Sequence, residues 1–154
     1  MRHQPEIQRA TYEHAEAIAA RARAMDILET RALVDLDARE AVLRCLDRSV
    51  RAWTWVEEGE PAAIFGLCTT NLIGERAVAW MVTTDIVDRR RVRFLRYCRT
   101  ILGELRAIYP HLESEVDERH TACLRWLRSL GFTIHPARPF GSLKMPFHHV
   151  EIGA

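Results

Sequence analysis

The middle of the chain joins an apolar, strand-like segment directly to an arginine-rich stretch without glycine, MVTTDIVDRRRVRFL (81–95). Guanidinium groups donate paired hydrogen bonds to phosphate or carboxylate, and helix N-termini attract anions. The junction can therefore bind an anion, a nucleic-acid backbone or a partner protein, or it can be a solvated helix face. Because Lys144 is the only lysine, arginine is the general basic residue here, which favours the solvated face. The arginines concerned are Arg89, Arg90, Arg91, Arg93, Arg96 and Arg99.

A second group of side chains is suited to proton transfer. In HLESEVDE (111–118), carboxylates alternate with Leu112, Ser114 and Val116, and His120 follows at the junction with the next helix. An exposed carboxylate titrates near ~4 and is a poor base at neutral pH, whereas an unperturbed histidine titrates near ~6.5. Glu113, Glu115 and Asp117 are candidate bases if their face of the strand lines a cleft, with Glu115 preferred among them, and His120 is the better-placed titratable group. The alternatives are an ordinary polar strand face and a histidine that caps a helix or bonds a carbonyl.

Histidines and cysteines give no metal or disulfide pattern. His148 and His149 are adjacent on an expected strand near His135, and adjacent strand residues point to opposite faces, so no metal site is predicted. The cysteines are widely spaced among apolar residues and form no CxxC pair, which is typical of reduced, buried thiols.

The hydrophobic pattern predicts the elements that position these residues. A strand at 6–10 precedes a helix capped by Thr11, and a second helix is capped by Asp37, whereas the irregular segment 25–36 gives no prediction. A hairpin at 51–70 turns at Gly59, and a strand at 76–84 follows a turn at Gly74. A helix over 88–108, N-capped by Asp88, a strand at 111–118, a helix ended by Gly131 and two last strands complete the chain.

Length and composition limit the functional classes. A chain of 154 residues with 48% hydrophobic residues suits a single domain over 1–154. The net charge of +1 gives no general attraction to nucleic acid or membrane. The first residues lack the apolar run of a signal peptide, and no stretch has the ~20 apolar residues that span a bilayer. We expect a protein located inside the cell, or packaged by something assembled there.

The element order and the ending HTACLRWLRSLGF (120–132) resemble the GNAT acyltransferase superfamily over nearly the whole chain, as does the opening IQRATYEHAEAIA (7–19). The resemblance implies an α/β (α+β) fold with a mixed, mostly antiparallel sheet of six to seven strands and helices on both faces. It also implies that acyl-CoA lies where the strands AVAWMVTTD (77–85) and LESEVDE (112–118) splay apart.

Two family motifs are missing. The family's third helix opens with a glycine-containing Q/R-x-x-G-x-G/A loop around the pyrophosphate, and this chain has DIVDRRRVRFL there. Counting back from Gly131, His120 takes the place of the family's asparagine, and Leu127 takes that of the tyrosine that protonates the departing thiolate. Leucine has no proton to give, and the indole of Trp126 only donates a hydrogen bond.

A narrower resemblance covers the C-terminal part. The arginine-bearing helix, HLESEVDERH and TACLRWLRSLGF followed by HPARPFG are similar to the GNAT-like internal core proteins of short-tailed bacteriophages and prophages. This resemblance implies a virion component, assembled in the bacterial cytoplasm, that contacts virion proteins or itself and requires no cofactor.

Three hypotheses remain open. The first is the virion structural or binding component. The second is an active N-acyltransferase that uses acetyl-CoA on an unknown amine, with Glu115 or His120 as base. It would hold the cofactor through the backbone of Val82, Thr83 and Thr84 and the side chains of Arg89, Arg90 and Arg91. The third is a nucleic-acid-binding module, which is less favoured because no exposed aromatic series interrupts the arginines.

Overall fold

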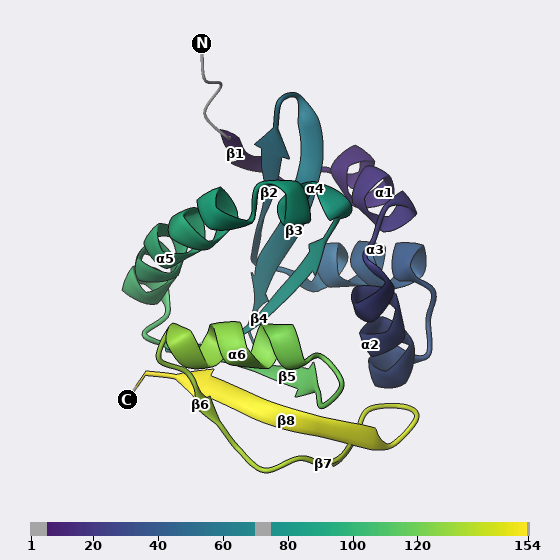
Figure 1. Ribbon diagram of the computed structural model, residues 1–154, viewed down its shortest axis with the longest axis vertical. Helices are drawn as coiled ribbons and strands as arrows, with labels where there is room; N and C mark the ends of the chain where they lie inside the picture. Colours follow the sequence, from purple (N-terminus) through teal and green to yellow (C-terminus); the bar gives the residue numbers. More distant parts are fainter. Residues whose placement is uncertain (1–5, 70–74, 154) are drawn as a thin grey trace.

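A computed structural model describes residues 6–69 and 75–153 of the chain (Figure 1). Its elements are β1 (Glu6–Arg9), α1 (Tyr12–Ala20), α2 (Ala24–Val34), α3 (Ala38–Arg48), β2 (Arg51–Glu57), β3 (Glu60–Cys68), β4 (Arg76–Thr83), α4 (Asp85–Arg89), α5 (Arg91–Ile108), β5 (His111–Asp117), α6 (Thr121–Ser129), β6 (Thr133–Ile134), β7 (Arg138–Phe140) and β8 (Met145–Ile152). The predicted turn at Gly74 lies outside the described residues.

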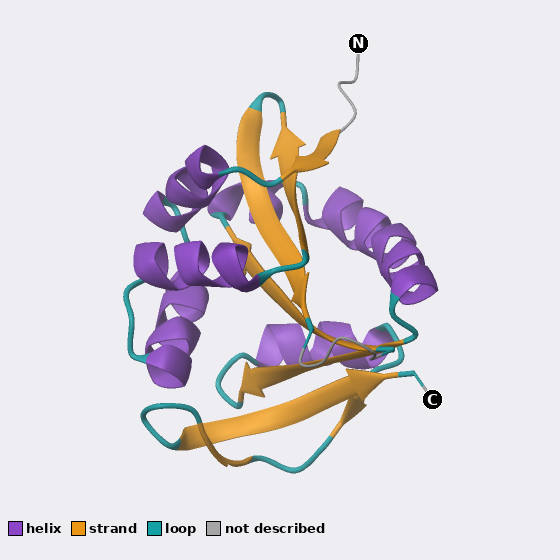
Figure 2. Ribbon diagram, turned by 180° about the vertical axis from the view of Figure 1, so that it is seen from behind, coloured by secondary structure: helices purple, strands orange, loops and turns teal. Residues whose placement is uncertain are grey.

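The strands form one mixed sheet in the order β1-β2-β3-β4-β5-β8-β6, and β7 also pairs with β8. All neighbours are antiparallel except β4 and β5, which run parallel. Helices cover both faces, with α1 and α3 in front in Figure 2 and α5 and α6 in front in Figure 1. The predicted fold class is confirmed. The described part has eight strands rather than six or seven, because the tail folds as β6, β7 and β8.

Apolar residues at helical spacing attach each helix to its face. On one face, Ile18 of α1 and Val42 of α3 pack against Ile64 of β3. On the other face, Phe94 of α5 packs against Trp55, with ring centroids 5.0 Å apart. Trp55 is buried and belongs to the core. The helix α6 packs on β5 and β8 through the cluster Val116, Leu124, Leu127, Phe132 and Val150.

Several local predictions are confirmed. Thr11 caps α1, since its Oγ1 accepts the His14 N–H at 3.1 Å, and Asp37 caps α3 by accepting the Glu40 N–H at 2.8 Å. The β2–β3 hairpin turns at Gly59, with φ of 81°. Gly131 follows α6 with φ of 99°, a conformation that suits glycine.

Two helical segments differ from the predictions. The helix α2 occupies the segment for which the sequence gave no prediction. The helix could not be predicted because its buried residues include Asp26 and do not form an apolar stripe. The predicted helix over 88–108 is instead divided at Arg90 into α4 and α5. Asp88 is therefore not the N-cap. Thr84 caps α4, its Oγ1 accepting the Ile86 N–H at 3.3 Å. Within residues 6–69 and 75–153, no helix combines the length and apolar character needed to cross a membrane.

Candidate functional site

The strands β4 and β5 form a wedge that is closed at one end and open at the other. Only three residue pairs join them, from Arg76 with His111 to Val78 with Glu113. Beyond these pairs the two strands separate toward their C-terminal tips, which are Thr83 in β4 and Asp117 in β5. Figure 1 shows α6 lying in front of β5, and residues of both α5 and α6 line the space between the two strands. The parallel strands thus produce the splayed geometry that the sequence resemblance implied.

The wedge contains a largely apolar cavity of about 340 Å³ under α5 and α6. The inner side of α5 contributes Cys98 and Leu102, and the inner side of α6 contributes Trp126 and Leu127. Polar side chains gather mainly near the strand tips and helix starts, where the cavity is lined by Arg23, Asp26, Glu29, Thr83, Asp88, Arg91 and His120. The site therefore combines a space for an apolar chain with groups that can bind charge.

Two carboxylates of α2 hold the two strand tips. Asp26, which is 7% exposed, accepts the Thr83 N–H at 3.0 Å and the Thr83 hydroxyl at 2.9 Å, both through Oδ2. Glu29, one turn later, accepts the Asp117 N–H at 3.0 Å through Oε2. The sequence analysis missed both residues. The only available signal was two acids three positions apart in a segment without a clear helical pattern.

His120 stands at the tip of β5, immediately before α6. It is 8% exposed, lines the cavity, and its Nδ1 lies 3.2 Å from Glu29 Oε2. Because a carboxylate only accepts, Nδ1 is the donor, which leaves Nε2 as an acceptor in the neutral ring. Burial lowers the pKa of His120, but the hydrogen bond and charge of Glu29 raise it more, so the net pKa lies above its ordinary value. His120 is therefore held in a defined tautomer at the cavity.

Glu115, the other predicted base, is bonded to side chains of other strands. Its carboxylate binds Arg138 of β7 at 2.8 and 2.9 Å and His149 of the neighbouring strand β8 at 2.9 Å. Burial raises the pKa of Glu115, but these two partners lower it more, so the net pKa lies below its ordinary value. Although Glu115 belongs to the cavity wall, these contacts make it a weaker base than His120.

The backbone N–H groups at the end of β4 are largely hydrogen-bonded already. The Thr84 N–H bonds to Ala62 O at 3.0 Å on the β3 side, and the Thr83 N–H is taken by Asp26. Since N–H direction alternates along a strand, the N–H groups of Met81 and Ala79 point away from β3, as that of Thr83 does. Both residues line the cavity. The last pair of the parallel ladder, Val78 with Glu113, uses the Ala79 N–H. A ligand in the wedge is thus offered the N–H of Met81 rather than those of Val82 to Thr84.

The three consecutive arginines have different surroundings. Arg89 pairs with Asp85 at 3.6 Å, and Arg90 pairs with Glu58 at 2.6 Å. Arg91 lines the cavity and forms no ion pair with any residue in the described ranges. It is also the first residue of α5, whose N-terminus has no side-chain cap. The N–H groups of Arg91 and Val92 lack intrahelical acceptors there, so one arginine and one helix end remain available to an anion.

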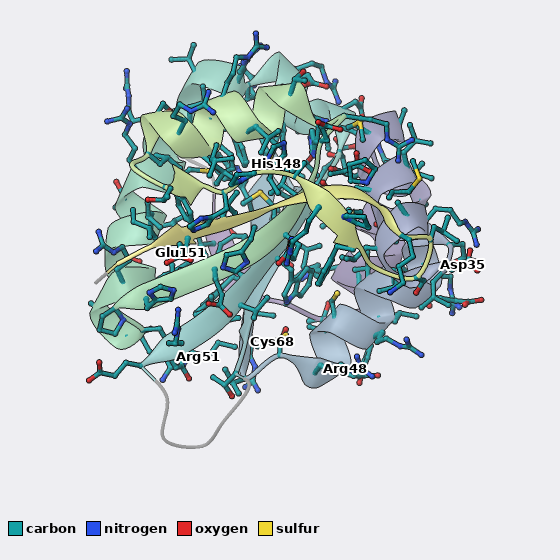
Figure 3. All side chains as sticks on the ribbon, turned by 90° about the horizontal axis from the view of Figure 1, so that it is seen from below. Asp35, Arg48, Arg51, Cys68, His148 and Glu151 are labelled. Carbon is teal, nitrogen blue, oxygen red and sulfur yellow. The ribbon has the colours of Figure 1, made fainter. Side chains whose placement is uncertain are left out.

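The C-terminal histidines form a polar network on the sheet. His135 and His149 each place Nε2 within 3.2 Å of Glu151 Oε2, and His148 donates from Nδ1 to the His135 carbonyl at 2.7 Å. His148 and Glu151 are labelled on β8 in Figure 3. Across the part of the chain that the structure describes, no group of three or more histidine, cysteine, aspartate or glutamate side chains is arranged to hold a metal ion.

Comparison with known proteins identifies the fold. No family model and no curated protein matches the sequence. Among solved structures, Ard1 from Thermoplasma volcanium is 13% identical with a TM-score of 0.72, covering 97% of this chain and 98% of that one. An acetyltransferase of the GNAT family from Streptococcus pneumoniae is 13% identical with a TM-score of 0.62, covering 96% and 98%. The chain has the GNAT acetyltransferase fold.

Another similar structure was solved with coenzyme A bound. The ribosomal L7/L12 alpha-N-protein acetyltransferase RimL, in complex with coenzyme A, is 12% identical with a TM-score of 0.65, covering 96% of this chain and 90% of that one. The wider resemblance seen in the sequence is thus confirmed at the level of fold. The narrower resemblance to bacteriophage core proteins has no support from these similarities. At such low identities the similarity does not extend to activity.

Proposed function

We propose that this GNAT-fold protein is an N-acyltransferase that moves an acyl group from acyl-CoA to an amine. The observation that carries the proposal is the wedge between β4 and β5, with its apolar cavity of about 340 Å³. This volume lies in the range of about 300–1,000 Å³ typical of small-ligand sites. The cavity also reaches the start of α5 at Arg91, so a single elongated ligand can contact both regions.

The residues present fit an acyl-CoA. The outward N–H group of Met81 can bind an amide carbonyl of the pantetheine arm, as a neighbouring strand would. The α5 N-terminus and Arg91 can bind the pyrophosphate by helix-end N–H groups and a guanidinium, in place of a glycine loop. When bound, the cofactor supplies a thioester whose carbonyl carbon an amine can attack.

His120 is suited to both proton transfers. Nε2 can accept a proton from the attacking amine while Nδ1 donates to Glu29. As the C–N bond forms and the C–S bond breaks, the resulting imidazolium can return this proton to the departing thiolate. The raised pKa of His120 means that Glu29 stabilises the imidazolium between the two steps. The chain thereby needs no acid at Leu127.

The virion component and the nucleic-acid-binding module remain predictions from the sequence. The similar structures described above are acetyltransferases or proteins of that fold, and they support the acyltransferase hypothesis better. A cavity that did not bind acyl-CoA would restore the virion component as the first hypothesis.

Calorimetric titration with acetyl-CoA tests the proposed function. We expect wild-type protein to bind in the micromolar range, and Arg91→Gln to bind about tenfold or more weakly, since a hydrogen bond to a charged group contributes about 1.5–3 kcal/mol. Arg89→Gln is the matched control, because Arg89 is paired with Asp85 and should leave the affinity unchanged. No heat from wild-type protein up to millimolar acetyl-CoA would refute the proposal.

A further inference from the structure

The outer surface of α5 and α6 carries an uncompensated positive charge. Glu104 is the only acidic residue on either helix. Five exposed arginines, here called the α5–α6 arginine face, form no ion pair within residues 6–69 and 75–153: Arg96, Arg99, Arg106, Arg125 and Arg128. Ten other arginines, of which Arg93 also belongs to α5, do form such pairs: Arg21, Arg23, Arg31, Arg39, Arg76, Arg89, Arg90, Arg93, Arg119 and Arg138.

This positive charge is concentrated on two helices, and the repulsion between its arginines is destabilising. The whole chain has a net charge of only +1, so the excess is concentrated on these two helices. Arg96 and Arg99, and likewise Arg125 and Arg128, are three positions apart, a spacing at which side chains are neighbours on a helix and like charges repel. An anionic partner would remove this repulsion. Electrostatic complementarity of this kind steers association and sets partner choice.

The neighbouring surface favours an acidic protein over a nucleic acid. The side chain of Val92 is 73% exposed at the start of α5, and Ile108 is 41% exposed at its end. Exposed aliphatic side chains beside arginine suit a protein interface. Of the aromatic residues on the two helices, Phe94 is buried and Tyr97 and Trp126 are partly buried, so no stacking platform for bases is present on their described outer surface.

The same two helices form the roof of the cavity. Cys98 and Leu102 of α5 and Leu127 of α6 line it from within, while the arginines lie outside. A partner bound to the arginine face is therefore placed beside the cavity. A pantetheine arm attached to that partner needs no nucleotide recognition. This agrees with the short helix α4, whose first N–H groups already bond to Thr84.

We infer that the α5–α6 arginine face docks an acidic carrier protein, which presents the acyl group as a thioester on a phosphopantetheine arm. The inference rests on the proposed function and names its acyl donor. The arm enters the cavity and its phosphate lies at the α5 N-terminus near Arg91. Acyl transfer forms the N–C bond of the product, breaks the C–S bond to the arm, and moves the amine proton through His120 to the arm's thiolate.

Titration of the full chain with a bacterial acyl carrier protein tests the docking surface. The carrier is used with an acetylated arm and, separately, in the apo form without the arm. Arg125→Glu/Arg128→Glu reverses charge on the face, and Arg44→Glu/Arg48→Glu is the matched control on α3, where both arginines are exposed and lie on the other side of the sheet. We expect the acetylated carrier to bind more tightly than the apo carrier, and the face variant to bind at least about tenfold more weakly.

Acetyl-CoA and a short DNA duplex are titrated in parallel. The face variant should keep wild-type affinity for acetyl-CoA, and the control variant should match wild type for both ligands. If acetyl-CoA binds and the carrier does not, the docking inference fails while the proposed function stands. An unchanged carrier affinity in the face variant, equal binding of apo and acetylated carrier, or DNA binding that this variant abolishes would each overturn the inference. If neither acetyl-CoA nor carrier binds, both proposals fail.

Discussion

Asp26 and Glu29 lie one turn apart on α2, and each carboxylate accepts the backbone N–H at the tip of a different strand of the wedge. Asp26 binds the tip of β4 at Thr83, and Glu29 binds the tip of β5 at Asp117. A strand tip that diverges from its neighbour has no sheet partner for its N–H groups, and such groups are costly to bury without an acceptor. The helix α2 thus supplies the acceptors that allow the two strands to separate.

Replacing Asp26 tests this role. Asp26→Ala leaves the Thr83 N–H and hydroxyl without their acceptor in a buried place, so we expect a loss of about 1–3 kcal/mol in the free energy of unfolding. Urea denaturation measures this loss. Glu16→Ala is the control, since Glu16 forms an exposed ion pair with Arg39 and its removal should hardly change the midpoint. Equal urea midpoints for Asp26→Ala and wild type would contradict the role of Asp26 as the acceptor at the tip of β4.

Glu29→Gln should lower the pKa of His120. The neutral amide removes the charge that raises this pKa in the wild type, while the burial that lowers it remains. An NMR titration of the histidine ring measures the shift, and Glu16→Gln should leave the His120 curve in place.

The raised pKa of His120 also predicts how the stability of the folded protein depends on pH. Because the folded pKa lies above the ordinary value of 6.5, the stabilisation that the Glu29–His120 interaction gives is fully present below pH 6.5 and is lost as the pH rises through the folded pKa. The difference in the free energy of unfolding between wild type and Glu29→Gln should therefore decrease as the pH rises. A difference that grew with rising pH would exclude the Glu29–His120 interaction.

Cys123 should resist alkylation in the folded protein. Burial, followed by the charges of Glu29 and Asp26, raises the pKa of this thiol to about 12, and burial raises that of Cys98 to about 12 as well. The reactive thiolate is therefore scarce at pH 8. Mass spectrometry after iodoacetamide treatment should find both thiols largely unmodified until urea unfolds the chain. Rapid modification of Cys123 at pH 8 would show that it is an accessible thiolate and a competing nucleophile in the cavity.

The sequence predicted those elements whose signals are local. Thr11 and Asp37 cap helices through contacts three positions away, and Gly131 takes a backbone conformation that glycine favours. The division of the long helix at Arg90 was missed, because the apolar side chains continue at helical spacing across the break. Nothing local distinguishes Arg90 from the arginines on either side of it.

The candidate site was predicted in part for the same reason. His120 was found because it stands at a recognisable strand-to-helix junction. Its partner Glu29 is 91 positions away and lies on a helix without an apolar stripe, so only the folded chain brings the pair together. The arginines Arg89, Arg90 and Arg91 are adjacent in sequence, yet helix geometry and nearby carboxylates give each a different environment. Pairing of that kind depends on distant residues and cannot be seen in the local pattern.

His120 and Glu115, the two bases suggested by the sequence, can be separated by their effects on turnover. Thiol release from acetyl-CoA over a panel of primary amines identifies an acceptor and gives kcat. We expect His120→Gln to lower kcat by about 10²–10⁴-fold, the usual contribution of general acid–base catalysis, while acetyl-CoA affinity stays near that of the wild type. Glu115→Gln should change kcat little, because Glu115 is bonded to Arg138 and His149 rather than free to accept a proton. A large loss in Glu115→Gln with normal turnover in His120→Gln would reverse the assignment and place the base on β5.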